Sequence, residues 1–189
     1  FVSKVVEQVS QLKVQDPFDP NCQFGALMNE AHMNKVLAYI DKGKEEGAKL
    51  ILGGNRAEVT SVDGTYLAGY FVEPTIFDQV DPQSTIAQEE IFGPVLSIIS
   101  FKDEAEAIRI ANDSCFGLAA FAATQNLGIV HRLGRCLNAG QLMVIGSCSP
   151  DVGTVAIADE PHRESGFGFE KGLAGLVSYT VSTTVTVLT

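Results

Sequence analysis

The chain has 189 residues, of which 46% are hydrophobic and 19% are charged. Such a chain can bury a core, and its length suits one compact domain, or a core with an arm, better than two full domains. Lys and Arg number 13 against 23 Asp and Glu, giving a net charge of −10. Because the basic residues are scattered, this acidic chain is a poor candidate for binding nucleic acid or an anionic membrane.

No apolar stretch reaches the roughly 18 residues that a membrane-spanning helix needs. The N-terminal stretch lacks the basic-then-apolar layout of a secretory signal, and residue 1 is not methionine, so we expect a processed or trimmed chain. The four cysteines are Cys22, Cys115, Cys136 and Cys148. Their wide, irregular spacing favours free thiols in a cytoplasmic protein over zinc ligands or disulfides, and we expect no metal site.

Apolar residues at helical spacing predict two helices near the N-terminus. The first begins the chain and carries an apolar stripe made up of Val2, Val5, Val6, Val9 and Leu12. Prolines at positions 17 and 20 break it, because each disfavours helix in the residue before it. The second follows Asn29, a good N-cap residue, and is expected to stop at Gly43 or Gly47.

Extended segments follow the second helix. Lys49–Leu52 predicts a short strand, and residues 55–69 predict a loop or loose hairpin. Tyr70–Phe77 predicts an extended stretch, which Pro74 is expected to push towards a sheet edge or a bulge, since proline donates no ladder hydrogen bond.

Strand and helix patterns alternate from residue 94 onward. The predicted strands are Val95–Phe101, Leu118–Ala123 and Gln141–Ile145. Between them, Asp103 and Glu106 form a capping box at one helix, and Asn126 caps another. This alternation predicts right-handed βαβ units and therefore an α/β fold of three layers (α/β/α), in which helices cover a mostly parallel sheet.

The C-terminal segment is rich in β-branched residues and alternates in polarity from Thr184 onward. A strand without a partner exposes its backbone hydrogen-bonding groups unless something pairs with it. We therefore divide the chain into a main portion, residues 1–177, and an oligomerisation strand, residues 178–189, that docks on another copy. The alternative is an ordinary last strand of the main sheet.

The most informative motif is Glu-Glu-Ile-Phe-Gly-Pro-Val at residues 89–95. It places two carboxylates and an aromatic ring just before a Gly-Pro turn and a buried strand, at the kind of sheet edge where α/β proteins bind ligands. A carboxylate there can accept hydrogen bonds from the diol of a ribose, and the ring can lie against a flat heterocycle. The plainer interpretation is a solvated helix end followed by a core strand.

This motif resembles the signature of the aldehyde dehydrogenase family, and further similar stretches occur in the family's order. They include residues 16–20, 70–75, 112–114, 117–120, 139–140 and 165–168. The resemblance covers nearly the whole chain and is nearest to enzymes of the aminoaldehyde type (betaine aldehyde or γ-glutamyl-aminobutyraldehyde dehydrogenases). It implies that Glu90 holds the ribose of NAD or NADP and that Phe92 packs beside the nicotinamide.

In that family a cysteine thiolate attacks a small aldehyde, hydride passes to NAD(P)⁺, and a glutamate activates the water that completes hydrolysis. The resemblance places that cysteine, that glutamate and the Gly-rich cofactor motif upstream of residue 1. We therefore expect this chain to carry no catalytic residue, to bind the cofactor weakly or not at all, and to be inactive alone. The alternative is a non-catalytic module of the same fold that binds a partner or self-associates.

The sequence departs from the family's pattern at two single positions and in one six-residue segment. Ile145 stands where the family has Asn, and residues 158–163 replace its Pro-Phe-Gly-Gly loop and the Lys that follows. The second change puts the loop near the substrate mouth in doubt, and both changes motivate the non-catalytic alternative. Phe116 in place of the usual Tyr is a milder change.

Other candidate residues are weaker. Residues 166–172 read GxGxxxG, but no strand directly precedes them, so a flexible entry to a short helix is the better interpretation. Cys148 follows a predicted strand, with His162 as a conceivable base, but no third orienting group is evident and a plain loop or buried thiol is favoured. His32 and His131 are expected to have surface or packing roles.

Overall fold

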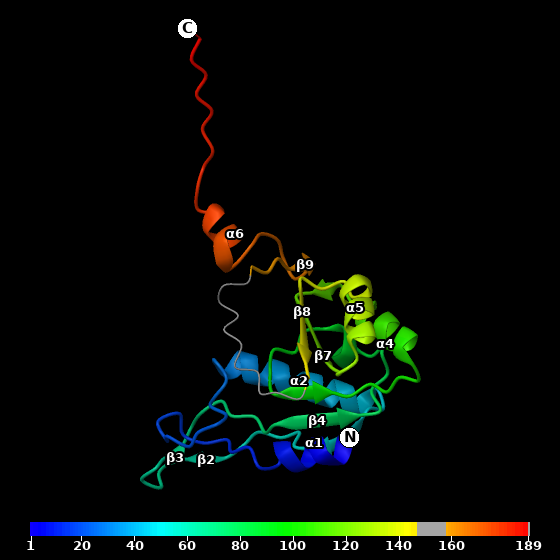
Figure 1. The fold of residues 1–189 in the computed structure, drawn as a ribbon. Helices are drawn as coiled ribbons and strands as arrows, with labels where there is room; N and C mark the ends of the chain where they lie inside the picture. The colour runs from blue at the N-terminus through cyan, green and yellow to red at the C-terminus, as the bar shows by residue number, and fades with distance from the viewer. Residues whose placement is uncertain (147–157, 189) are drawn as a thin grey trace. The chain divides into compact units, whose positions relative to one another are not determined.

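The computed structural model describes residues 1–146 and 158–188 (Figure 1). The chain divides into two compact units, Phe1–Phe101 and Lys102–Thr189. Each unit has its own helices and strands and is described by itself below.

The two helices predicted near the N-terminus are present in the first unit. They are α1, Val2–Val9, and α2, Glu30–Glu45. The Asn29 side chain accepts a hydrogen bond of 2.8 Å from the His32 backbone N–H, so the predicted N-cap is confirmed. The helix runs past Gly43, and Gly47, with a φ of 87°, follows its end. Of the two predicted stops, Gly47 is correct because only it has the left-handed conformation typical of a helix end.

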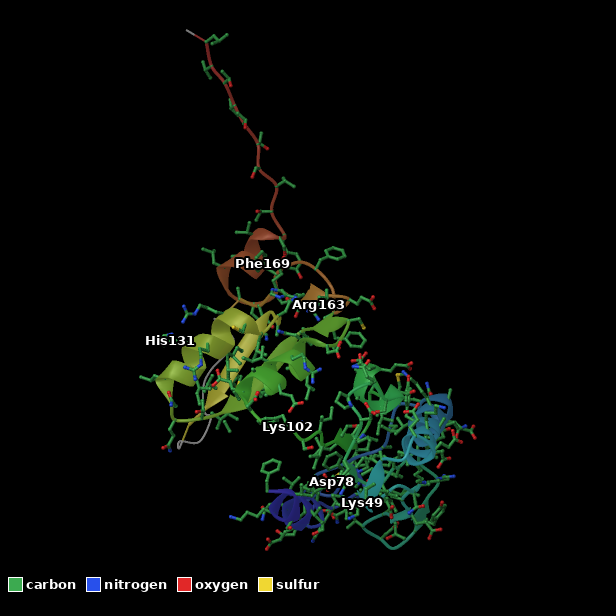
Figure 2. The ribbon with its side chains drawn as sticks, turned by 90° about the vertical axis from the view of Figure 1, so that its right-hand side faces the viewer. Lys49, Asp78, Lys102, His131, Arg163 and Phe169 are labelled. Atoms are coloured by element: carbon green, nitrogen blue, oxygen red, sulfur yellow. The ribbon has the colours of Figure 1, made fainter. Side chains whose placement is uncertain are left out.

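The first unit also contains a three-stranded sheet in the order β1-β4-β5. Its strands are β1, Lys49–Leu52, β4, Thr75–Asp78, and β5, Val95–Ser97. Strands β1 and β4 are antiparallel, with Lys49 opposite Asp78 (Figure 2), whereas β4 and β5 are parallel. A loose hairpin of β2, Val59–Thr60, and β3, Tyr66–Leu67, lies within the predicted loop.

The expectation that Pro74 marks a sheet edge is wrong. Strand β4 is the central strand, and Pro74 lies just before its first residue. The missing N–H of proline therefore costs the ladder no hydrogen bond. The irregularity lies in the neighbouring strand, where the register shifts between Leu50 and Leu52, and Gly53 approaches the Pro74 carbonyl so closely that a Cβ would lie 2.3 Å from it.

The core of the first unit lies between α2 and the sheet. Its most completely buried apolar side chains are Val36 and Ile40 of α2 and Phe77 of β4. Ile86, in the short helix α3 (Thr85–Gln88), and Ile91 join the same cluster. The segment that leads from α3 into β5 is therefore anchored in the core through Ile91.

Unit two contains the predicted alternation of strand and helix after its first strand. The predicted strand Val95–Phe101 belongs to the first unit and ends at Ser97, and Phe101 is exposed. The helices of unit two are α4, Glu104–Asn112, α5, Leu127–Cys136, and α6, Gly172–Val177, and its strands are β6, Phe116–Gly117, β7, Ala119–Ala123, β8, Gln141–Ile145, and β9, His162–Arg163. Strands β7 and β8 are parallel and are joined through α5, whereas β6 and β9 are antiparallel. Figure 1 shows α4 and α5 as neighbouring helices, and an ion pair of 2.6 Å joins Glu104 to Arg132.

Both predicted caps of unit two are confirmed. The Asp103 side chain accepts a hydrogen bond of 2.8 Å from the Glu106 N–H, and the Glu106 carboxylate accepts one of 2.7 Å from the Lys102 N–H. Asn126 caps α5 through the Gly128 N–H at 2.9 Å.

Residues 178–188 form no strand with any part of the chain that the structure describes. Their apolar side chains are exposed, with Tyr179 at 90%, Val181 at 92% and Leu188 at 93%. The alternative of an ordinary last strand of the main sheet therefore finds no support, while docking on another copy stays a prediction.

Candidate functional site

The two predicted site residues lie on the short segment between α3 and β5, and both side chains face solvent. Phe92 is 71% exposed, and Glu90 is also exposed. Ile91 between them is only 8% exposed and contributes to the core. The segment thus buries one side chain while presenting an acid and an aromatic ring together on the surface.

Close packing fixes this segment against α2. A Cβ at Gly93 would lie 2.6 Å from a methyl group of Val36, so only glycine fits this approach. The next carbonyl, that of Pro94, accepts a hydrogen bond of 2.8 Å from the Thr75 N–H at the start of β4. Phe92 itself has a φ of 58°, which a non-glycine residue seldom adopts.

Three side chains of α2 bind the same segment. Tyr39 Oη donates to Glu89 Oε2 at 2.7 Å, Lys35 Nζ donates to the Glu90 carbonyl at 3.3 Å, and His32 Nε2 lies 2.7 Å from the Phe92 carbonyl. The hydrogen bond to Glu89, together with burial and the carboxylate charge, raises the pKa of Tyr39. The sequence analysis assigned no site role to these residues, although their spacing places them along one side of the helix.

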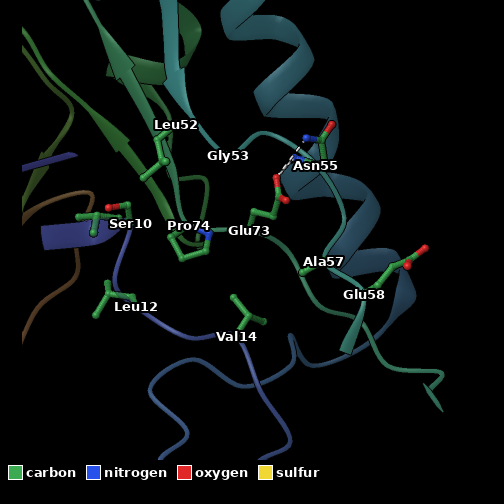
Figure 3. Close-up of a pocket in the computed structure, with 11 residues that line it drawn as sticks. Ser10, Leu12, Val14, Leu52, Gly53, Asn55, Ala57, Glu58, Glu73 and Pro74 are labelled. Atoms are coloured by element: carbon green, nitrogen blue, oxygen red, sulfur yellow. Dashed lines mark hydrogen bonds between the residues drawn. The ribbon is translucent and has the colours of Figure 1, made fainter. Parts of the chain in front are cut away.

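The described residues of the first unit line hollows on its surface, and two of them bear on the candidate site. One, of about 300 Å³, borders Gly93 and Pro94 and is otherwise lined by residues 24–27 and Val72. The other, of about 500 Å³, lies beside Leu52, Gly53 and Pro74 (Figure 3). The Asn55 amide donates to Glu73 Oε2 at 3.1 Å there, and neither Glu90 nor Phe92 lines this hollow.

Two residues of the segment that departs from the family's pattern, His162 and Arg163, belong to a polar network in unit two. Arg163 Nη1 donates to the Asn112 carbonyl at 2.8 Å and also to that of Ser114, so the cation closes the C-terminal end of α4. The Asn138 amide lies 2.8 Å from His162 Nδ1 and, oriented to satisfy both neighbours, accepts from Arg163 Nε at 2.8 Å. Ile145 ends β8 and is 37% exposed.

The weaker nucleophile candidate gains no support. Cys148 lies outside the described residues, and one ring nitrogen of its conceivable base, His162, is engaged by Asn138.

Two other sequence features also offer no chemistry. Loss of hydration and then a hydrogen bond to Glu164 raise the pKa of the Cys115 thiol, which keeps it protonated and poorly reactive. The glycines of residues 166–172 lead into α6, as the plainer interpretation predicted, with φ values of 134° at Gly166 and 90° at Gly168.

Within residues 1–146 and 158–188 no helix combines the length and the apolar character that crossing a bilayer requires. In the same ranges no three His, Cys, Asp or Glu side chains gather closely enough to hold a metal ion. The cysteines described there, Cys22, Cys115 and Cys136, are unpaired thiols.

Comparison with known proteins identifies the class of this α/β chain. It matches the aldehyde dehydrogenase family over residues 1–185. A betaine aldehyde dehydrogenase of Brucella anthropi is 42% identical over 188 residues, which are 98% of this chain and 37% of the relative. HpcC from Thermus thermophilus has a TM-score of 0.84 and 41% identity, covering 94% of this chain and 34% of that one. Betaine aldehyde dehydrogenase from Staphylococcus aureus, solved in complex with NAD⁺, has a TM-score of 0.83 and 32% identity, covering 95% of this chain and 34% of that one.

The structural similarity to these solved proteins confirms the predicted α/β class. The fold is that of a family of oxidoreductases. The chain belongs to the aldehyde dehydrogenase family. It spans 37% of the length of the curated relative from Brucella anthropi.

Proposed function

We propose that this chain supplies the nicotinamide-side wall of an active site that oxidises a small aldehyde with NAD⁺ or NADP⁺. The observation that carries the proposal is the joint exposure of Glu90 and Phe92 on a segment that is otherwise tightly held, in a chain that matches the family over residues 1–185. A solved relative with NAD⁺ bound supports the choice of cofactor.

The residues present fit this cofactor. Within the described residues, no hydrogen bond or ion pair of the Glu90 carboxylate is found, so it is free to accept from the two hydroxyls of the nicotinamide ribose. The exposed Phe92 ring offers an apolar face to the nicotinamide. When bound, the cofactor accepts the hydride, while these two side chains bind and orient its nicotinamide end.

We further propose an aminoaldehyde substrate of the betaine aldehyde type and a cytoplasmic location. The name of the Brucella relative at 42% identity supports the first, and the unpaired Cys22, Cys115 and Cys136 agree with the second. Because the family's nucleophile is expected upstream of residue 1, the 189-residue chain alone should not turn over.

Titration of the ¹⁵N-labelled chain with millimolar NAD⁺ tests the proposed cofactor contact. We expect fast-exchange shifts at the amides of residues 89–93 and a dissociation constant above about 1 mM, because the family resemblance places the Gly-rich phosphate-binding motif upstream of residue 1. Glu90→Gln, which keeps the shape but removes the charge, should weaken binding about tenfold. The matched control Glu58→Gln changes an exposed carboxylate of the same unit and should bind as the wild type does.

Two outcomes would count against the proposal. Micromolar affinity would show that this chain holds a cofactor site of its own, and NAD⁺-dependent oxidation of betaine aldehyde by the chain alone would show that it holds a nucleophile. An absence of shifts at residues 89–93 would favour the non-catalytic module.

We also propose that residues 1–177 form the family portion and that residues 178–189 pair with a second copy of the chain. Two observations support this proposal. The apolar side chains of residues 178–188 are exposed, and these residues pair with no strand in the described part of the chain. Deleting residues 178–189 is expected to lower the oligomeric state measured by multi-angle light scattering. If the shortened and full-length chains form assemblies with the same number of subunits, the strand does not mediate assembly.

A further inference from the structure

One side of α2 carries three hydrogen-bond donors that all reach the segment containing Glu90 and Phe92. His32, Lys35 and Tyr39 are spaced by three and four residues, so their side chains project from the same side of the helix. Their partners follow one another in the opposite direction, from Glu89 through Glu90 to Phe92. The segment therefore runs along α2 and is bound at three successive points.

The contacts restrain the backbone and leave the two site side chains free. Lys35 and His32 both bind main-chain carbonyls, those of Glu90 and Phe92. Tyr39 binds the carboxylate of Glu89, not that of Glu90, and also holds Lys35, whose Nζ lies 5.5 Å from the centre of its ring. With Ile91 buried between these points, the Glu90 carboxylate and the Phe92 ring are directed into solvent.

The contact of His32 has a particular function because Phe92 is conformationally strained. A left-handed φ of 58° is costly for a residue with a Cβ, and it persists only where surrounding contacts enforce it. The His32 ring nitrogen lies 2.7 Å from the carbonyl of that same residue, and the two rings lie 6.0 Å apart. His32 thus holds Phe92 by its backbone and flanks its ring.

The geometry also assigns the tautomer of the neutral imidazole. A carbonyl oxygen only accepts hydrogen bonds, so the proton must be on Nε2. Nδ1 is buried without a partner in the described structure, and burying an unpaired N–H there would cost free energy. The contact with the Phe92 carbonyl therefore selects the Nε2–H form, in which His32 acts as a donor.

We infer that His32 is a positioning residue: with Lys35 and Tyr39 it fixes the 89–92 segment on α2 so that Glu90 and Phe92 together face the nicotinamide-ribose half of a dinucleotide. This inference rests on the proposed function, since that function gives the two side chains their ligand. The restraint itself is a property of the free chain and can be measured without cofactor.

Two substitutions separate the donor function of His32 from its bulk. His32→Leu keeps an apolar side chain of similar size but cannot donate, whereas His32→Gln restores an amide N–H. His131→Leu is the matched control, because His131 is an exposed histidine in unit two (Figure 2). Hydrogen exchange of the peptide covering residues 89–95 reports the restraint, NAD⁺-induced shifts report ligand contact, and ¹⁵N shifts of the imidazole report its tautomer.

We expect His32→Leu to speed exchange in residues 89–95 by about fivefold or more, the factor that one net hydrogen bond contributes, and to weaken the NAD⁺ contact by a similar factor. His32→Gln should recover most of both losses, and His131→Leu should show neither. The wild-type imidazole of His32 should give the ¹⁵N pattern of the Nε2–H tautomer.

The inference is overturned if His32→Leu leaves exchange unchanged, or if the tautomer is Nδ1–H. It is also overturned if exchange rises but NAD⁺ binding is unaffected, because the segment would then not need to be held. Absence of NAD⁺ shifts in the wild-type chain, with the expected exchange and tautomer, would instead reject the proposed cofactor contact. The two failures are therefore distinguishable.

Discussion

Replacing Phe77 with alanine is expected to lower the free energy of unfolding by about 3–5 kcal/mol, as large-to-small changes at fully buried aromatic positions do. Phe77 has 0% exposure and lies in the central strand of its sheet. Its ring packs against α2, where a Cβ at Gly43 would lie 3.2 Å from it. Truncation leaves a cavity between helix and sheet that neither can close without breaking other contacts.

The loss should extend to the candidate site, because Ile91 belongs to the same buried cluster as Phe77. Urea unfolding followed by circular dichroism measures the stability, and exchange of residues 89–95 measures the segment. Phe18→Ala is the control, since Phe18 is 92% exposed in the same unit and its truncation should change stability by less than about 0.5 kcal/mol. Equal effects of the two substitutions would show that the core does not lie where Phe77 places it.

Local patterns in the sequence predicted much of the secondary structure. Strands β1 and β8 have the predicted bounds, and Asn29, Asp103 and Asn126 cap the helices that follow them. The caps depend on contacts between residues at most three positions apart, and the strand bounds follow short apolar runs, so both signals are visible in the sequence itself. Pro74 shows the limit, because whether a strand is central or at an edge depends on partners that pair with it from elsewhere in the chain.

The candidate site divides in the same way. Glu90 and Phe92 were predicted from the motif that contains them, and the structure adds that both are exposed on a restrained segment. The support from α2 was not predicted, because His32 and Phe92 are 60 positions apart. The regular spacing of polar residues on α2 was visible in the sequence, but it is typical of any solvated helix face and does not identify a partner.

For residues 158–163, the sequence and the structure lead to different conclusions about whether the loop is structurally intact. Its sequence departs from the family's pattern, yet its residues make specific contacts: Arg163 closes the end of α4, and the Asp159 N–H donates to the Glu170 carbonyl at 3.1 Å. A loop that had lost its structural role would not be expected to keep such contacts. Besides the pairing of His162 and Arg163 with β6, the loop passes so close to Gly140 that a Cβ there would clash with the Glu160 carbonyl. Gly140 is therefore a good position at which to test how the loop packs.

Substituting Gly140 with alanine is expected to destabilise unit two by an amount near the upper end of about 1–3 kcal/mol, the range typical of overpacked sites. The added Cβ would lie 1.8 Å from the Glu160 carbonyl oxygen and 2.7 Å from its carbon. Relief by moving Gly140 is blocked, because its N–H donates to the Gly117 carbonyl at 3.0 Å and the Gln141 N–H donates to that of Leu118 at 3.1 Å. The methyl group must therefore displace the loop.

Gly134→Ala is the matched control. Its Cβ would come no closer than 4.0 Å to Leu142, and alanine inside α5 should stabilise the helix by about 0.5–1 kcal/mol. Hydrogen exchange of residues 116–123 and urea unfolding measure both variants, and if Gly140→Ala is tolerated as well as Gly134→Ala, the 158–163 loop does not pack on this strand pair.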